Sequence, residues 1–292
     1  MRSWQLVLLS FVMGFADSAA GDDAVRHRFL CVDNGQNRLI FVDQLHADRS
    51  WTTPIPAGSR DLQLLGAKGQ PPDRILVSHG NGAAEYDLAT GRPREWVVDR
   101  YHDIQTAVRL ENGETWLGRV DGTLFRLDPG GKELAAIPPP IKMNIRLMRP
   151  TAEGHWLLGG AGPPAILELD PHGRLVRQVP IPGGNKGYKA IRLAKGTYLT
   201  GTGDGCTIVE VDSTGKVLST VGGKQEHPQL GLDFCSGWDL LPNGNRLMAN
   251  WLGHGKQGKG VHLAEFTADN RLVWQWGDHQ LARQVTNVLV LE

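Results

Sequence analysis

The sequence predicts an all-β protein built from repeated four-stranded antiparallel sheets. A turn of the form Asp-x-x-Gly-Lys/Arg recurs along the chain, and the Gly or Asn that closes it stands at positions 91, 131, 173, 215 and 270, which are 40, 42, 42 and 55 residues apart. A second repeat reads AVRLENG at 107–113, IRLMRPTAEG at 145–154, AIRLAKG at 190–196 and WDLLPNG at 238–244. Short strands with such turns and a period in the low forties are typical of a β-propeller with four-stranded blades.

The two repeats together predict six blades. The segment 60–69, RDLQLLGAKG, is a looser copy of the second repeat and supplies a fifth inner strand. A further unit at residues 28–55 has three strand-like pieces but no inner strand. The missing strand is expected at 284–291, QVTNVLVL, near the other end of the chain. We therefore predict a single propeller domain over 28–292, in which the C-terminal strand closes the first blade and removes the open sheet edges.

The first residues have the pattern of a secretory signal peptide. Arg2 precedes an apolar segment from Leu6 to Ala16, and Ser18-x-Ala20 supplies a small-residue cleavage site. We predict a signal peptide over 1–20, a short N-terminal segment over 21–27, and export to the periplasm or the exterior. A membrane anchor is the alternative, but the apolar segment is short for a bilayer span.

Composition narrows the partners. The chain has 31 Lys and Arg against 31 Asp and Glu, so a general nucleic-acid or membrane-surface binder is not expected. No later segment is apolar enough for membrane insertion, and a monomer is expected. Three cysteines occur without a C-x-x-C motif. Cys31 lies within a predicted strand, whereas Cys206 and Cys235 fall in loops of neighbouring blades and are candidates for a disulfide in an exported protein.

These repeats resemble those of bacterial exported six-bladed β-propellers in the broad group of NHL-repeat, PQQ-repeat-like and gluconolactonase-like proteins. The resemblance covers nearly all of the predicted mature chain. It implies the fold but not the activity, since similar repeats occur in enzymes and in proteins that only bind. Gluconolactonase-type enzymes place a metal-binding glutamate near the start of the propeller, and this chain has no glutamate before Glu85. We therefore predict no metal site and no cofactor.

Ligands of propellers usually meet the funnel face formed by the loops that enter the inner strands and those that join the second and third strands. The residues there that we expect to bind a ligand are Asn81, Asn144, Tyr188, Trp238, Asn250, Trp251, His254, Lys256 and Asn287. His254 and Lys256 belong to a glycine-rich loop over 252–260. The loop contains G-x-G-x-x-G, but a strand rather than a helix follows it, which argues against a nucleotide site.

Four residues of the same face are weak catalytic candidates. His79 and His102 could act as general bases or metal ligands, or could simply cap their loops. Asp103 follows His102, but adjacent residues of a strand point to opposite faces, which argues against a pair. Asp121 and Asp204 stand beside glycines, where turn stabilisation explains them equally well.

Two functions are compatible with these patterns. The first is a non-catalytic exported propeller that binds a small molecule, a glycan or a protein at the funnel face. The alternative is a metal-assisted lactonase-like or hydrolase-like enzyme that uses the same face. Convergence of His79, His102, Asp121 and Asp204 would favour the enzyme.

Overall fold

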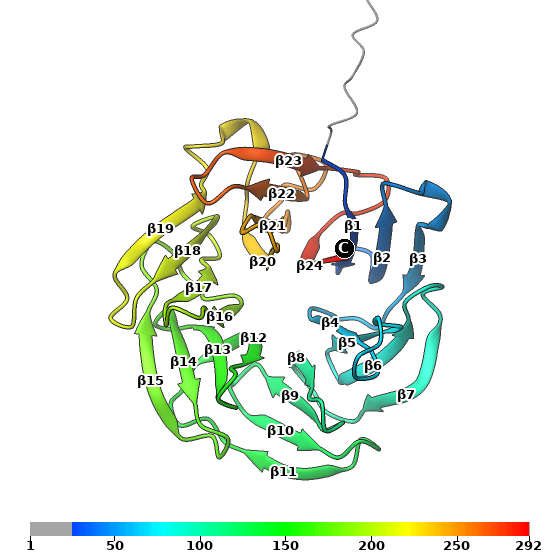
Figure 1. Cartoon of the computed structure of the whole chain (residues 1–292), viewed down its shortest axis with the longest axis vertical. Coiled ribbons are helices and arrows are strands. Elements are labelled where there is room, and N and C mark those ends of the chain that lie inside the picture. The colour runs from blue at the N-terminus through cyan, green and yellow to red at the C-terminus, as the bar shows by residue number, and fades with distance from the viewer. Residues whose placement is uncertain (1–24, 292) are drawn as a thin grey trace, which may run out of the picture.

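The computed structural model describes residues 25–291, which form six four-stranded antiparallel sheets arranged in a ring (Figure 1). The predicted signal peptide over 1–20 lies outside the described residues. We number the sheets as blades 1 to 6 in chain order. The six-bladed propeller predicted from the repeats is confirmed. No helix among the described residues is both long and apolar enough to span a bilayer.

Each blade has four strands, which follow one another from the channel to the outer edge. Blade 1 contains β24 (Val285–Leu291), β1 (Arg28–Asp33), β2 (Arg38–Asp43) and β3 (Trp51–Pro54), and blade 2 contains β4 (Leu62–Leu65), β5 (Arg74–His79), β6 (Gly82–Asp87) and β7 (Pro93–Asp99). Blade 3 contains β8 (Ile104–Arg109), β9 (Thr115–Arg119), β10 (Leu124–Leu127) and β11 (Glu133–Ile137), and blade 4 contains β12 (Asn144–Pro150), β13 (Trp156–Ala161), β14 (Ala165–Leu169) and β15 (Leu175–Pro180). Blade 5 contains β16 (Ala190–Arg192), β17 (Tyr198–Gly201), β18 (Thr207–Val211) and β19 (Val217–Gly222), and blade 6 contains β20 (Cys235–Leu240), β21 (Arg246–Asn250), β22 (Leu263–Phe266) and β23 (Leu272–Trp276). Two short 3₁₀ helices, η1 (Ala47–Arg49) and η2 (Pro228–Leu230), lie in loops.

The repeated outer turns have the backbone geometry that their sequence predicts. Gly173 has a φ of 80° and Asn270 a φ of 64°, in the left-handed region that Gly and Asn adopt most readily. The side chain of Asp170 accepts hydrogen bonds from the backbone amides of His172 and Arg174. The Asp and the Gly of each repeat are therefore explained by the turn itself.

The C-terminal strand closes the ring. β24 pairs antiparallel with β1 from Arg28↔Leu291 to Asp33↔Val285, so the two segments lie side by side, red against blue, in Figure 1. The buried carboxylate of Asp33 accepts hydrogen bonds from the backbone amides of Arg283 and Gln284 at 3.1 and 2.7 Å, which fixes the chain as it enters β24. The predicted completion of the first blade is confirmed.

Four blades carry a buried glutamate at the same place in the third strand, two residues before the Asp or Thr of the outer turn. The exposed fractions are 3% for Glu85, 3% for Glu168, 4% for Glu210 and 1% for Glu265. Each carboxylate contacts a residue of its own blade and reaches the following blade as well. Because burying a carboxylate is costly unless it is paired, each glutamate acts as a clamp that holds two blades in register.

The partners of these glutamates differ from blade to blade. Glu85 of blade 2 contacts the Nη1 atom of Arg109 in blade 3 at 2.6 Å. Glu168 of blade 4 accepts a hydrogen bond from the Tyr198 hydroxyl of blade 5 at 2.8 Å, and Glu210 of blade 5 lies 3.6 Å from Nη2 of Arg246 in blade 6. Glu265 of blade 6 contacts Nε2 of His27, just before β1, at 2.6 Å, so the ring junction has a clamp of its own.

Replacement of Glu265 by glutamine tests this clamp and its pH dependence. Burial alone raises the pKa of Glu265, but hydrogen bonds from His27 and Asn245 outweigh it and hold the pKa below the ordinary value. The contribution of the carboxylate is therefore complete above its unfolded pKa of about 4.3 and is lost as the pH falls through the lower folded pKa.

We expect Glu265→Gln to lower the free energy of unfolding at pH 7 by about 1–3 kcal/mol and to converge with the wild type in acid. Urea denaturation between pH 3 and pH 7 measures this. Glu95→Gln, at an exposed glutamate of β7, serves as the control. An equal effect of the two substitutions would contradict a clamp.

Candidate functional site

The centre of the ring is occupied by a buried polar network to which the inner strands of all six blades contribute. Its core is the carboxylate of Asp61, which precedes β4 and is completely buried. Arg149 of β12 donates to both Asp61 oxygens, at 2.7 and 2.9 Å, and the Thr106 hydroxyl of β8 donates to one of them at 2.5 Å. Asn287 of β24 adds a hydrogen bond of 3.2 Å. Blades 1 to 4 therefore meet at one carboxylate.

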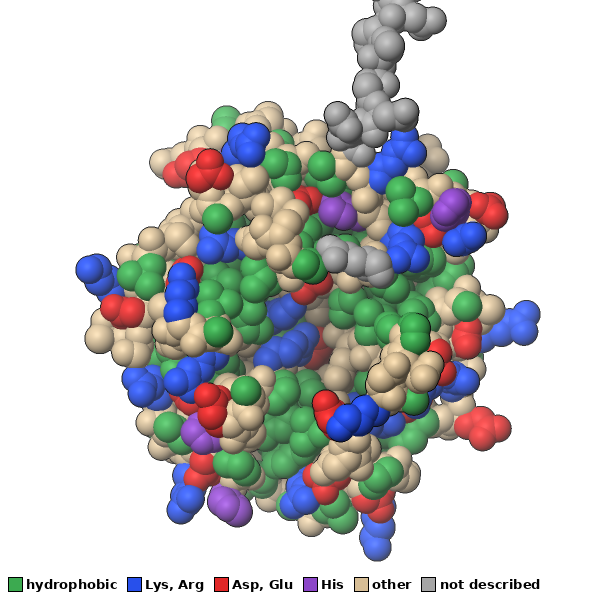
Figure 2. All heavy atoms as spheres, viewed as in Figure 1, with side chains coloured by type: hydrophobic (Ala, Val, Ile, Leu, Met, Phe, Trp, Pro, Cys, Tyr) green, Lys and Arg blue, Asp and Glu red, His purple; other side chains and the backbone are tan. Residues whose placement is uncertain are grey.

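Blades 5 and 6 complete the network with a second pair. Lys189 immediately precedes β16. Its ammonium group donates a hydrogen bond to the backbone carbonyl of Trp238 at 2.7 Å and lies 3.4 Å from Oδ1 of Asp239. The other oxygen of Asp239 accepts a hydrogen bond from the backbone amide of Val290. Basic and acidic side chains meet at the centre of the face shown in Figure 2. Two cations and two carboxylates thus balance one another in the channel.

A second set of charged side chains lies at the end of the channel where the inner strands begin. We call this end the entry mouth. Arg60 precedes β4, Arg146 lies on β12 and Lys186 precedes β16, and all three side chains are half-buried. Burial lowers the pKa of Lys186, and the positive charges of Arg146 and Arg60 lower it further, against the opposing charge of Asp204. Burial also lowers the pKa of Arg146, and Arg60 adds to that effect. The positive charges of Arg60, Arg146 and Lys186 therefore oppose one another at the entry mouth.

The positive charge of the entry mouth is opposed by the nearby carboxylate of Asp204, but not through an ion pair. No ion pair joins Arg60, Arg146 or Lys186 to a carboxylate in the described part of the chain, and the buried Nε atom of Arg60 has no hydrogen-bond partner there. Arg146 donates to the side-chain oxygen of Asn144 and to the carbonyl of Ile145, both neutral acceptors. Such an arrangement favours the approach of an anion.

Aromatic side chains surround Phe234, beside these cations. The Phe234 ring lies edge-on to Tyr188, Trp251 and His254, with centroid distances of 6.0, 5.9 and 5.7 Å. The ammonium group of Lys186 lies 5.5 Å from the same ring centroid, in a cation–π contact. His254 belongs to the glycine-rich loop over 252–260, so this loop folds back onto the entry mouth. Three of the residues that the sequence predicts to bind a ligand are thereby brought together.

The four catalytic candidates are not bonded to one another. Among the described residues, no hydrogen bond or ion pair joins any two of them. His79 is buried, which lowers its pKa against the opposing charge of Asp99, and its Nδ1 accepts a hydrogen bond from the amide of Asn81. Asp204 is held by the Asn185 side chain.

The other two catalytic candidates have partners nearby in sequence. Asp121 forms an ion pair with Arg119. Hydrogen bonds from the Arg119 guanidinium hold the pKa of Asp121 well below the usual range of an aspartate. His102 is exposed, and its Nδ1 lies 3.3 Å from Asp103. The expectation that these neighbours point apart is wrong, because Asp103 has a φ of 57° and is not extended.

The remaining ligand-binding candidates divide into two groups. Trp238, Asn250 and Asn287 are almost completely buried. The Trp238 indole donates to the carbonyl of Lys189, and the Asn250 side chain bonds the backbone of Asp233 and Val261. Their polar atoms are thus used within the protein. Asn144 and Lys256 are exposed on the entry side, whereas Asn81 is an exposed loop residue beside His79.

The backbones of Cys206 and Cys235 lie close together. Their amides donate to the same oxygen, the carbonyl of Gly203, at 3.0 and 2.9 Å. Both are buried free thiols in the structure, and burial raises the pKa of Cys206 to about 11. A disulfide between them stays a prediction. Cys31 is a buried strand residue, as its sequence context indicates.

The ligand-binding residues predicted from the sequence do not include those that define the entry mouth most clearly. Arg60 and Arg146 lie within the inner-strand repeats, and Phe234 lies in the insertion before β20. One signal was present in the sequence: a basic residue stands at the approach to the inner strand in blades 2, 4 and 5. Within residues 25–291 there is no group of three or more His, Cys, Asp or Glu side chains arranged to hold a metal ion.

Comparison with solved structures supports the fold alone. A protein of unknown function from Bacteroides caccae matches with a TM-score of 0.72 and 21% identity, over 92% of this chain and 100% of that one. A streptogramin B lyase matches with a TM-score of 0.57 and 13% identity, over 87% and 84% of the two chains. The WD40 β-propeller domain of Doa1 matches with a TM-score of 0.58 and 14% identity, over 86% of this chain and 79% of that one. Neither the known family models nor the curated protein sequences match this chain.

Replacement of Asp61 by asparagine tests the central network. The substitution keeps the shape of the side chain but leaves the half-buried Arg149 without a counter-charge, and we expect it to cost about 3–5 kcal/mol of the free energy of unfolding. The double variant Asp61→Asn/Arg149→Met removes the orphaned charge and should recover part of that loss. Urea denaturation of the three proteins measures both effects. A double variant less stable than Asp61→Asn would show that the pair does not act through charge balance.

Proposed function

We propose that the chain is an exported, non-catalytic β-propeller that binds a small anionic molecule at the entry mouth. The observation that carries the proposal is the convergence of Arg60, Arg146 and Lys186 without a carboxylate partner. Charged groups that are partly withdrawn from water and unpaired are unfavourable in the free protein, and a bound anion would relieve that cost.

The shape and the lining of the entry mouth support a small ligand. The cations are half-buried around the start of the channel, where a small anion can approach all three, whereas a flat protein surface would reach them less easily. Trp251 is partly exposed and offers apolar contact for the remainder of the molecule, and it packs against the buried cluster that contains Tyr188 and Phe234. The indole N–H of Trp251 is held by Asn34 at 3.1 Å, so this ring is fixed before a ligand arrives. Preorganisation of that kind lowers the entropic cost of binding.

Removal of single cations tests the proposal. We expect Arg146→Gln and Arg60→Gln each to weaken binding of a small anion by about tenfold to a hundredfold, because each substitution removes one charge-assisted hydrogen bond. Isothermal titration with phosphate, citrate and glucuronate, with glucose as the neutral comparison, measures this at constant ionic strength.

The control substitution is Arg271→Gln, at an exposed arginine of the outer turn of blade 6, which makes the same change in net charge. It should leave binding unchanged. Equal affinities for Arg146→Gln and Arg271→Gln, or equal binding of glucuronate and glucose by the wild type, would refute a specific anion site.

A further inference from the structure

A cavity of about 340 Å³ lies at the opposite end of the channel, and we call it the exit pocket. It is enclosed by β4, β8, β12 and β24 and includes Leu110 and Glu111, which follow the end of β8. All inner strands run in the same direction along the channel. The exit pocket is therefore separate from the entry mouth and opens where the inner strands end. Its volume falls at the lower end of the range for small-molecule sites.

The lining of the exit pocket is mainly apolar. Its apolar residues are Leu62, Leu64, Val108, Leu110, Pro150, Val288 and Leu289, and the polar residues Gln63, Arg109 and Glu111 line it as well. Four inner strands supply these walls, and the pairing of β24 with β1 places Val288 and Leu289 beside the residues of β4. An apolar molecule in this space would bury its surface against a rigid lining instead of a mobile loop.

The polar end of the exit pocket offers hydrogen-bond donors. Arg149 and Lys189 both line the cavity and keep part of their side chains exposed, 18% and 11%. The hydrogen bonds of Arg149 use both hydrogens of Nη1 and one of Nη2, and those of Lys189 use two of its three hydrogens. Asn287 donates one of its two amide hydrogens to Asp61, and its oxygen accepts a hydrogen bond from the Val288 amide. The groups left for a ligand are thus N–H donors, those of Arg149 and Lys189 among them.

The cations at this end are nevertheless neutralised. Arg149 is paired with Asp61, Lys189 with Asp239 and Arg109 with Glu85, while the exposed Glu111 lies 4.0 Å from Lys68. An anionic ligand would lose its hydration without meeting an uncompensated positive charge, and it would be repelled by the two carboxylates behind the cations. A neutral oxygen that accepts a hydrogen bond pays a smaller desolvation cost and still satisfies a free donor. The balance of charge therefore selects a neutral ligand here, in contrast to the entry mouth.

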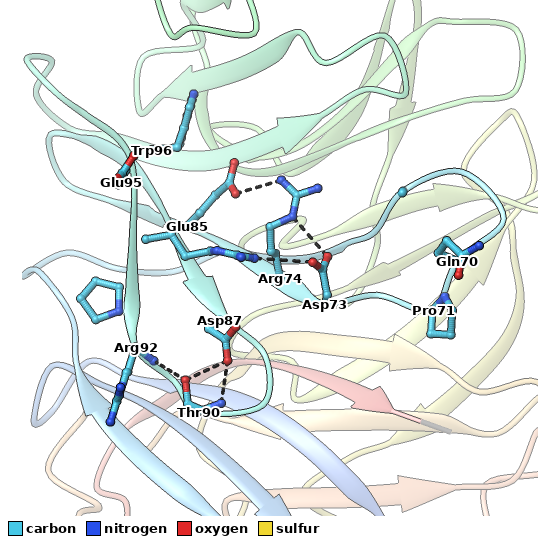
Figure 3. A pocket seen from close by; sticks show the side chains of 13 residues that line it. Gln70, Pro71, Asp73, Arg74, Glu85, Asp87, Thr90, Arg92, Glu95 and Trp96 are labelled. Carbon is cyan, nitrogen blue, oxygen red and sulfur yellow. Dashed lines mark hydrogen bonds and ion pairs between the residues drawn. The ribbon is translucent and has the colours of Figure 1, made fainter.

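The larger groove on the outside of blade 2 does not offer comparable free groups. It measures about 1140 Å³ and is lined by charged residues of β5, β6 and β7. Figure 3 shows that Arg74 lies between Glu85 and Asp73, at 3.1 and 3.2 Å, and that Asp87 is bonded to Thr90. Asp73, Arg74, Glu85 and Asp87 are therefore engaged in the structure of the blade edge, while Arg92 and Glu95 are exposed to solvent.

We propose that the exit pocket binds a neutral, mainly apolar small molecule whose carbonyl oxygen accepts a hydrogen bond from Arg149 or Lys189. A medium-chain ketone is a suitable probe, because its alkyl chain matches the apolar walls and its single acceptor matches the donors at the polar end.

Titration of the wild-type protein with 2-alkanones of increasing length tests the proposal by calorimetry. We expect the affinity to rise about fourfold for each added CH₂ group until the cavity is full, because each group is removed from water. Octanoate should bind at least tenfold more weakly than 2-octanone, since its charge is not compensated. An affinity independent of chain length, or tighter binding of octanoate, would overturn the proposal.

A matched pair of variants locates the ligand. Leu110 and Leu193 are equivalent residues, which follow the inner strands of blades 3 and 5. The backbone amide of each donates a hydrogen bond across the next turn. Leu110 lines the pocket, whereas Leu193 does not. Leu110→Trp should fill the cavity and weaken 2-octanone binding at least tenfold, and Leu193→Trp should leave it unchanged. Equal effects of the two would contradict the assigned place. If Leu110→Trp does not fold, the comparison of ketone and carboxylate on the wild type decides alone.

Discussion

The carboxylate of Asp61 is the point at which the blades of this propeller meet. It accepts hydrogen bonds from Thr106, Arg149, Asn287 and the backbone amide of Leu62, which together belong to four blades. A buried carboxylate tolerates few other environments, because the loss of Arg149 would leave its charge uncompensated and the loss of a neutral partner would leave an oxygen without a hydrogen bond. The geometry of the channel, and with it the spacing of the loops at both ends, depends on this group being fully satisfied.

The two ends of the channel differ in electrostatics although they are built from the same strands. At the entry mouth, Arg60, Arg146 and Lys186 remain unpaired beside aromatic rings. At the exit pocket, Arg149 and Lys189 are matched by Asp61 and Asp239 within apolar walls. Charge compensation, rather than the number of basic residues, separates a surface suited to anions from one suited to neutral molecules.

The parts of the fold predicted from the sequence are those that local chemistry determines. The Asp and Gly of the outer turns act within a few residues, and the strand over 284–291 was assigned to blade 1 because an unpaired sheet edge is unfavourable. The central network could not be predicted, because Asp61 and Arg149 are far apart in the chain and the inner-strand repeats that contain them do not indicate that they pair. Three of the buried glutamates belong to a repeated Glu-x-Asp pattern in the sequence, at 85–87, 168–170 and 210–212. The role of this pattern could be recognised only from the contacts that the glutamates make with the next blade. At the candidate site, the structure brings Tyr188, Trp251 and His254 together around Phe234, and the expectation that they bind a ligand stays a prediction. The side chains of Trp238 on β20 and Asn287 on β24 are enclosed, as is that of Tyr188.

The pairing of β24 with β1 joins segments at opposite ends of the described chain. A contact of that sequence separation forms only after nearly all of the polypeptide has been synthesised, which takes about 15–60 s at typical rates of translation. Until then β1 has a free edge, and the clamp between His27 and Glu265 is open. Completion of blade 1 is therefore expected to be the slow, late event in folding, and the incomplete ring is the species most exposed to strand exchange with other chains.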